Sequence, residues 1–133
     1  KFDLLQEYNS VIMKEIDRLV ANFQKTAEFF PDKKLYFYRI KNPKFNIGSI
    51  VSTILSLKQQ DCTFVIIYDI VDQKEFLRIN LRNQSGIRDL NELIKNSVKG
   101  LENAGGGGHP KASGGRIMKK DLERFKKNIL ANC

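Results

Sequence analysis

The sequence predicts one α/β domain in which helices pack on a mixed β-sheet of about four strands. Its 133 residues match the usual size of a single domain, and its 41% hydrophobic and 29% charged residues are typical of a globular chain. Segments with helical periodicity also alternate along the chain with short segments rich in β-branched and aromatic residues. No internal repeat or long linker interrupts that order, so we expect one domain.

The chain opens with an amphipathic pattern between Phe2 and Phe30. Apolar residues recur there at spacings of three, four or seven, with charged residues between them. This spacing predicts a helix, and the helix should end before Pro31 because proline disfavours helical backbone in the residue before it. The apolar residues of the predicted stripe are Leu5, Ile12, Ile16, Leu19 and Phe23.

The next segments predict strands and a helix in alternation. "KLYFYRI" (34–40) and "CTFVIIYDI" (62–70) have the aromatic and β-branched content of strands, and the second has the apolar run of a buried strand. The stretch 46–60 between them predicts a helix. "EFLRINLR" (75–82) alternates strictly, which predicts a strand with three apolar side chains on one face and three polar ones on the other. The apolar set is Leu77, Ile79 and Leu81, and the polar set is Arg78, Asn80 and Arg82.

The last third predicts a helix from about Gly86 to Asn103 with Ser85 as its N-terminal cap. A glycine-rich loop, a short strand at 115–119 and a final helix at 120–131 should follow. The final helix should bury Leu122, Phe125 and Ile129.

Charge and cysteine content restrict the class of protein. The net charge is +8, and residues 82–133 hold 11 basic against 5 acidic groups, so the positive excess accompanies the glycine-rich segment and favours anionic partners. No apolar run is long enough to span a membrane, so we expect no membrane partner. Two cysteines, Cys62 and Cys133, suggest neither a disulfide framework nor a zinc site, and a reducing cytoplasm is the expected location. The chain begins with Lys1 and lacks a signal-peptide pattern, so a piece of a longer protein is expected.

The segment "GGGGHPKASGG" (105–115) holds six of the nine glycines and the single histidine, His109. Three interpretations are open: a flexible linker, a tight turn, and a loop that brings its backbone against a ligand. A linker is usually glycine and serine with little else, and a turn needs only one or two glycines. The spacing fits neither a P-loop nor a dinucleotide-binding motif.

If the segment is a loop that brings its backbone against a ligand, it can bind an anion. Without Cβ atoms, the backbone N–H groups of Gly106, Gly107 and Gly108 can converge on phosphate oxygens, and His109 and Lys111 can add a hydrogen bond and a charge. The predicted face of Arg78, Asn80 and Arg82 would supply a second wall, in which Arg82 offers a planar fork suited to phosphate. The alternative is that this face is only the solvated side of a half-buried sheet.

These residues resemble a known family. "GGGGHPKASGG" is similar to the glycine and histidine signature of the DHH-associated domain, the C-terminal substrate-binding domain of DHH-family phosphoesterases such as RecJ-like exonucleases and oligoribonucleases. "INLRN" (79–83) resembles the strand of that family, with Asn80 and Asn83 where serines are usual. The resemblance covers roughly residues 34–119. It implies a connector helix at 1–30 and the substrate-binding domain at 31–133.

The resemblance also implies a division of labour. Gly106 to His109 would line the phosphate-binding loop, and Arg82 would hold the backbone of single-stranded DNA, RNA or a short oligonucleotide. Hydrolysis would need two divalent metal ions, manganese or magnesium, held by a separate N-terminal catalytic domain whose Asp-His-His motif this chain lacks. We therefore expect no cofactor, metal site or catalytic residue in this chain, which would bind its substrate and not cut it.

Two alternatives stay open. The same site could bind a small nucleotide, such as a cyclic dinucleotide or an adenosine bisphosphate. The chain could instead be a noncatalytic module whose basic last helix docks on a protein or membrane surface. The basic residues of that helix region are Lys119, Lys120, Arg124, Lys126 and Lys127.

Overall fold

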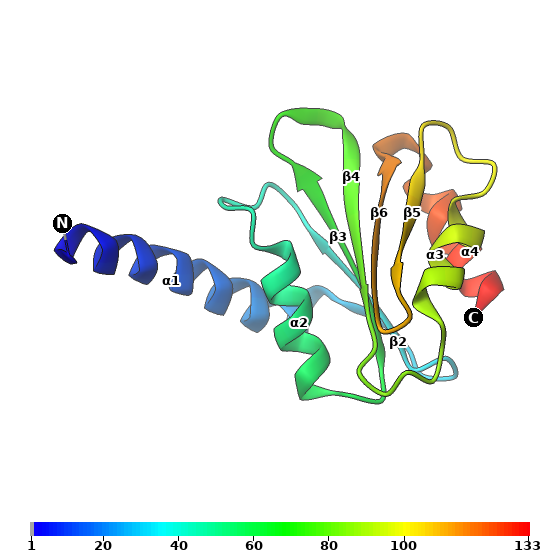
Figure 1. Cartoon of the computed structure of the whole chain (residues 1–133), viewed down its shortest axis with the longest axis horizontal. Coiled ribbons are helices and arrows are strands. Elements are labelled where there is room, and N and C mark those ends of the chain that lie inside the picture. The colour runs from blue at the N-terminus through cyan, green and yellow to red at the C-terminus, as the bar shows by residue number, and fades with distance from the viewer. Residues whose placement is uncertain (1) are drawn as a thin grey trace.

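The computed structural model describes residues 2–133 as a six-stranded mixed sheet with two helices on each face (Figure 1). The predicted fold class is confirmed, with six strands in place of about four. The elements in chain order are α1 (Phe2–Thr26), β1 (Glu28–Phe30), β2 (Leu35–Ile40), α2 (Gly48–Lys58), β3 (Thr63–Ile70), β4 (Gln73–Arg82), α3 (Leu90–Val98), β5 (Gly105–His109), β6 (Ala112–Met118), a 3₁₀ turn (Lys119–Asp121) and α4 (Leu122–Asn132).

The strands lie in the order β1-β2-β3-β4-β6-β5. Among the described strands only β2 and β3 pair in parallel, and α2 makes the crossover between them. All other neighbours are antiparallel: β3 with β4 and β5 with β6 form hairpins, and the connection from β4 to β5 contains α3. This arrangement puts the glycine-rich segment at one edge of the sheet.

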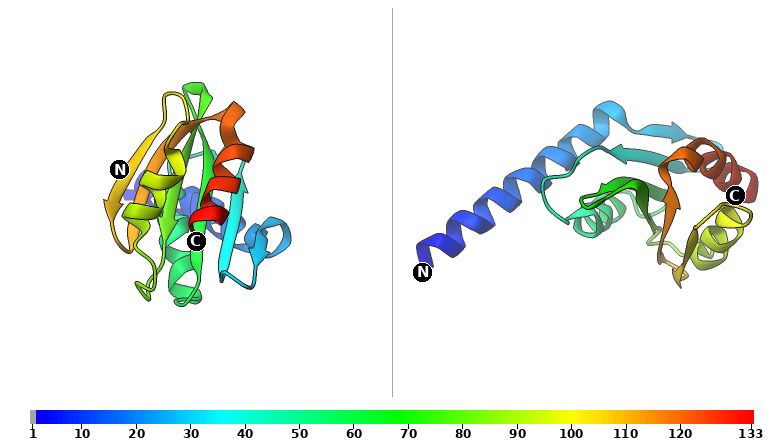
Figure 2. Two further views of the ribbon diagram at one scale, coloured as in Figure 1. Left: turned by 90° about the vertical axis from the view of Figure 1, so that its right-hand side faces the viewer. Right: turned by 90° about the horizontal axis from the view of Figure 1, so that it is seen from above.

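Each face of the sheet has its own apolar core. The first core joins β4 side chains to α3 and α4, and includes Leu77, Ile79, Leu81, Ile94 and Phe125. The second joins β2 and β3 to α1 and α2 on the opposite face. Figure 2 shows α3 and α4 packed on one side of the sheet and α2 on the other. The predicted alternation of β4 is therefore confirmed, because Leu77, Ile79 and Leu81 all point into the first core.

The first helix ends earlier than predicted. It stops at Thr26, and Glu28–Phe30 then forms the edge strand β1, in which Phe30 pairs with Leu35. The C-terminal half of α1 packs in the second core through Ile16, Leu19 and Phe23. Its N-terminal half extends away from the sheet (Figure 1).

The helix before the glycine segment is shorter than predicted. It begins at Leu90, and Asp89 caps it by accepting a hydrogen bond from the Glu92 N–H at 3.2 Å. Ser85 is not the cap, because its N–H and hydroxyl both donate to Asn83 Oδ1 and form a local turn. Ile87, predicted to lie in the apolar stripe, is consequently 75% exposed.

The glycine-rich segment is a β-hairpin and not a loop. β5 pairs with β6 from Gly105 opposite Arg116 to His109 opposite Ala112, and Pro110 and Lys111 make the turn. The turn is held at both carbonyls: Pro110 O accepts from the Leu90 N–H at 2.8 Å and Lys111 O from the Asn83 N–H at 3.1 Å. The linker interpretation and the predicted loop are therefore wrong, and the strand predicted at 115–119 begins earlier, at Ala112.

Close packing explains much of the glycine. A Cβ atom added to Gly106 would lie 2.5 Å from Ile94 Cγ1, and one added to Gly115 would lie 2.5 Å from the Gly105 carbonyl oxygen. Ile94 is fully buried on α3, so the helix presses directly on the backbone of the hairpin. At these two positions any side chain would push the helix or the partner strand away.

We expect Gly115→Ala to destabilise the protein by about 1–3 kcal/mol, because the added methyl group meets rigid backbone. Gly105→Ala is the matched control, since nothing lies within 4 Å of its added Cβ. Urea unfolding followed by circular dichroism measures both variants. Equal unfolding midpoints for the two variants would contradict the close packing of β5 on β6.

Candidate phosphate-binding site

One face of the β4, β6 and β5 ladder forms the candidate site. Residues paired in an antiparallel ladder project to the same face, so Arg82, Ala112 and His109 form one row across the three strands. Two strand spacings separate the ends of this row, about 10 Å between the Cα atoms of Arg82 and His109. Ala112 and the neighbouring Gly114 make a floor of small residues between them. The row thus has a guanidinium at one end and an imidazole at the other, with small residues between them, and we call this part of the sheet surface the trough.

Arg82 is the partly buried cation of the trough. Its Nη1 donates to the carbonyls of Leu81 at 2.9 Å and Ser113 at 3.3 Å, and its Nη2 donates to Ser49 Oγ at 3.2 Å. Burial lowers the pKa of Arg82 from the ordinary arginine value, because the guanidinium loses hydration. Within residues 4–133, no carboxylate forms an ion pair with this charge. The group remains charged, so the trough offers an anion a cation that lacks a counter-charge.

His109 lies exposed at the other end of the row. Its Nδ1 accepts a hydrogen bond from the Lys111 N–H at 3.2 Å, and its carbonyl accepts from Ser113 Oγ at 2.7 Å. When the imidazole is neutral, this leaves the proton on Nε2, which can donate to a ligand.

The glycine N–H groups are less free than predicted. The Gly108 N–H donates to Asn91 Oδ1, a side chain of α3, at 2.9 Å. The backbone of Gly108 has φ +146°, a conformation that side chains rarely permit. An anion that binds the Gly108 N–H would have to displace the Asn91 side chain. Other backbone groups of β5 are free of this restriction, because an edge strand leaves alternate backbone groups outside the ladder.

The structure separates the other predicted site residues. Asn80 is only 7% exposed and its amide lies 3.2 Å from the Tyr68 hydroxyl beneath α2, so it does not offer its side chain to a ligand. Arg78 is exposed and borders a hollow together with Arg116. Lys111 is exposed and its aliphatic stem lies over Gly86 in the connection between β4 and α3.

Three side chains of the site were missed in the sequence. Ser49 and Asn91 come from α2 and α3, and no local pattern links them to the glycine segment. Arg116 pairs with Arg78 across β4 and β6, so both project from the same face. The sequence did contain a signal for Arg116. It lies two residues after Gly114 and four after Ala112, and even spacing along a strand places side chains on the same face.

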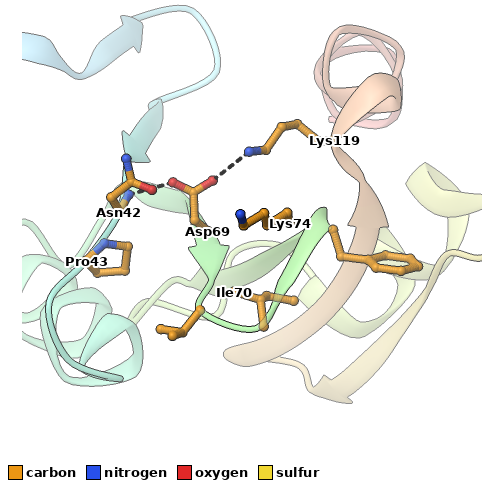
Figure 3. A pocket seen from close by; sticks show the side chains of 8 residues that line it. Asn42, Pro43, Asp69, Ile70, Lys74 and Lys119 are labelled. Atoms are coloured by element: carbon orange, nitrogen blue, oxygen red, sulfur yellow. Dashed lines mark hydrogen bonds and ion pairs between the residues drawn. The ribbon is translucent and has the colours of Figure 1, made fainter.

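A separate hollow lies at the end of β3, where Asp69 is the central charged group (Figure 3). The Asp69 carboxylate accepts hydrogen bonds from Arg39 Nη2 at 2.7 Å and from the Asn42 N–H, and pairs with Lys119 Nζ at 3.2 Å. Burial acts to raise the pKa of Asp69, but these three donors outweigh burial and hold the pKa below its usual value. Asp69 is therefore ionised, and its hydrogen bonds and ion pair link β3 to β2 and to the end of β6.

The described acidic residues are the candidate metal ligands for a hydrolytic centre. No group of three or more histidine, cysteine, aspartate or glutamate side chains within the described residues could hold a metal ion. None of the described helices combines the length and apolar character needed to cross a membrane.

The hydrogen bond from Lys111 fixes an observable property of His109. We expect the neutral ring to carry its proton on Nε2, because Nδ1 already accepts the backbone N–H. Long-range proton–nitrogen correlation NMR at alkaline pH distinguishes the two tautomers, and only one histidine contributes signals. A ring protonated on Nδ1 would contradict the turn geometry.

We expect Asp69→Asn to cost about 1–3 kcal/mol of stability at neutral pH, since it removes a charged acceptor of three donors. Because folding lowers the pKa of Asp69 from about 3.8, the stabilisation is complete above that value and is lost as pH falls through the lower pKa of the folded state. The difference between wild type and variant should therefore shrink in acid. Urea unfolding at a series of pH values measures it.

Asp61→Asn serves as the control, because the carboxylate and its partner Lys34 are both largely exposed. It should change stability little at any pH. A gap between wild type and Asp69→Asn that stays constant into acid would contradict a stabilising charge at Asp69.

Comparison with known proteins gives the same fold. No curated protein matches the chain significantly. RecJ from Thermus thermophilus in complex with Mn²⁺ matches with a TM-score of 0.73 and 14% identity, over 97% of this chain and 18% of RecJ. An exopolyphosphatase-related protein from Bacteroides fragilis matches with a TM-score of 0.64 and 16% identity, over 88% of this chain and 34% of its own.

A smaller structure is also similar. The C-Ala domain of Aquifex aeolicus alanyl-tRNA synthetase matches with a TM-score of 0.59 and 14% identity, over 79% of this chain and 96% of that domain. The chain thus spans less than two-fifths of the RecJ and exopolyphosphatase-related chains. The family model for the DHHA1 domain matches residues 32–133. On this match and this fold, the chain belongs to the DHHA1 domain family.

Proposed function

We propose that this chain is the substrate-binding part of a DHH-type phosphoesterase and holds the phosphodiester backbone of single-stranded DNA, RNA or a short oligonucleotide. The observation that carries the proposal is the Arg82 guanidinium, which is partly buried, bonded only to neutral oxygens and set opposite His109 across a floor of small residues. Such a charge is best neutralised by an anion that enters the trough.

Each end of the row has a distinct part in this mode of binding. The Arg82 fork would hold two oxygens of one phosphate, and the His109 Nε2–H would donate a hydrogen bond from the other side. The turn at Lys111 adds charge at the end of the row. Contacts of this kind fix the backbone of a nucleic acid and carry little sequence information.

Hydrolysis would belong to another part of the protein. In this proposal α1 connects the domain to a catalytic domain that supplies two manganese or magnesium ions, and the whole enzyme works in the cytoplasm. The similar RecJ structures contain Mn²⁺ or Mg²⁺, which supports this division. The residues of this chain would then bind and orient the substrate only.

Disruption of the trough should weaken binding of a fluorescent single-stranded oligonucleotide. We expect Arg82→Gln to raise the Kd about 10- to 100-fold at low salt, because a hydrogen-bonded charge is removed. His109→Ala should raise it less, since it removes a single donor. The plot of log affinity against log salt should also become shallower for Arg82→Gln, by about 0.7 for each phosphate that the variant no longer neutralises. Fluorescence anisotropy measures both quantities.

Arg124→Ala is the control, because Arg124 is exposed on α4, which packs on the other face of the sheet. Unchanged affinity in both trough variants would overturn the proposal, and a large loss of affinity in Arg124→Ala would indicate docking through the basic helix instead. Competition with ligands of increasing length separates the remaining alternative. A mononucleotide that competes as well as a longer oligonucleotide would identify a small nucleotide as the ligand.

A further inference from the structure

We infer that the hollow of Figure 3 is a nucleobase subsite in which the Phe76 ring is the stacking wall, so that the ligand is an oligonucleotide of several nucleotides. This inference rests on the proposed function, because it requires a nucleic acid backbone at Arg82. It goes beyond it by placing a base contact and by setting a minimum length for the ligand.

Phe76 lies on the same face of β4 as the two arginines of the site. Phe76, Arg78 and Arg82 are spaced by even numbers of residues along the strand, so their side chains project to one side. The Arg116 guanidinium lies 4.2 Å from the centre of the Phe76 ring, and its Nη1 donates to Gln73 Oε1 at 3.3 Å. The ring thus lies against a cation that also hydrogen-bonds to Gln73.

Phe76 is half-buried and is one of the residues that line the hollow, whereas Arg116 is not. The volume of the hollow is about 340 Å³, within the range of small-molecule sites. Pro43 and Ile70 make further apolar wall. A flat base can stack on Phe76 there whatever its identity, since every base has a π face.

Cations border the same hollow. Lys119 is held in place by Asp69, whereas Lys74 forms no ion pair within the described residues. Asn42 adds a side-chain amide that can hydrogen-bond to a base edge or a sugar. An apolar slot with an aromatic wall and a free ammonium group at its side suits a base that is attached to a phosphate.

The subsite lies on a path from Arg82. A second hollow shares four walls with the first, and Ser49 and Arg78 line it as well. Ser49 is the side chain that accepts the Arg82 hydrogen bond. From Arg82 to Phe76 the strand advances six residues, about 20 Å. A ligand that touches both ends must therefore contain several nucleotides.

An abasic scan tests the subsite. Eight-nucleotide single-stranded DNAs, each with one abasic site at a different position, are titrated against wild type, Phe76→Ala and Arg82→Gln. With wild type, we expect one abasic position to raise the Kd about 5- to 150-fold, the usual range for one stacked base. Phe76→Ala should raise the Kd for the intact DNA by a similar factor, and that abasic position should then have no further effect.

A dinucleotide separates this inference from the proposed function. It is too short to span the path, so Phe76→Ala should leave its affinity unchanged, while Arg82→Gln should weaken both ligands. Phe29→Ala is the matched control, because Phe29 is a half-exposed aromatic on β1 at the far edge of the sheet. Thermal unfolding confirms that each variant is folded.

Two results would overturn the subsite and leave the phosphate site intact. In the first, Phe76→Ala binds the eight-nucleotide DNA with the same Kd as Phe29→Ala. In the second, the abasic position still raises the Kd of Phe76→Ala. In either case Arg82→Gln would still weaken binding, and the Phe76 and Arg116 contact would serve only to brace the hairpin. Unchanged affinity in Arg82→Gln, together with unchanged affinity in His109→Ala, would instead overturn the proposed function itself.

Discussion

The contact of Ile94 with the backbone of Gly106 and Gly115 fixes the edge of the sheet on which the site is built. Because no side chain intervenes, α3 lies directly on the hairpin and its Asn91 reaches the N–H of Gly108. The close packing also holds the hairpin turn in place, because the first N–H of α3 donates a hydrogen bond to the Pro110 carbonyl. The glycines therefore act chiefly as a packing surface, and the position of His109 follows from the register that this packing imposes.

The helices cover the opposite face of the sheet unevenly, and the candidate site lies on the part of that face that stays open. On this face α2 lies over β3 and the middle of β4, where it buries Asn80 with Tyr68. None of the described helices covers β6 and β5 on that face, so Arg82 lies at the boundary between buried and open sheet (Figure 2). That boundary explains its combination of neutral hydrogen-bond partners and residual exposure. A cation held this way is oriented before a ligand arrives, which reduces the entropic cost of binding.

Side-chain periodicity determined which parts of the fold could be predicted. β4 was predicted correctly because Leu77, Ile79 and Leu81 alternate, and α4 because Phe125 and Ile129 recur at helical spacing. β5 was missed because glycine has low strand propensity and shows no apolar pattern, although backbone pairing with β6 suffices to make it a strand. The burial of Asn80 could not be predicted either. The alternation of β4 predicts the face of the sheet on which Asn80 lies, but not that a helix covers it. Ser49 and Asn91 belong to the site only through tertiary packing.

The claim that the open face of β4, β6 and β5 receives the ligand is tested most directly by NMR titration of ¹⁵N-labelled protein with a short single-stranded oligonucleotide. We expect the largest amide shifts at Gly105 to His109 and at Ala112 to Arg116, together with a shift of the Arg82 side-chain Nε–H. The amides of α4 should change little, because that helix packs on the other face. Shifts that are confined to α4 and its basic residues, with the glycine amides unmoved, would contradict the claim.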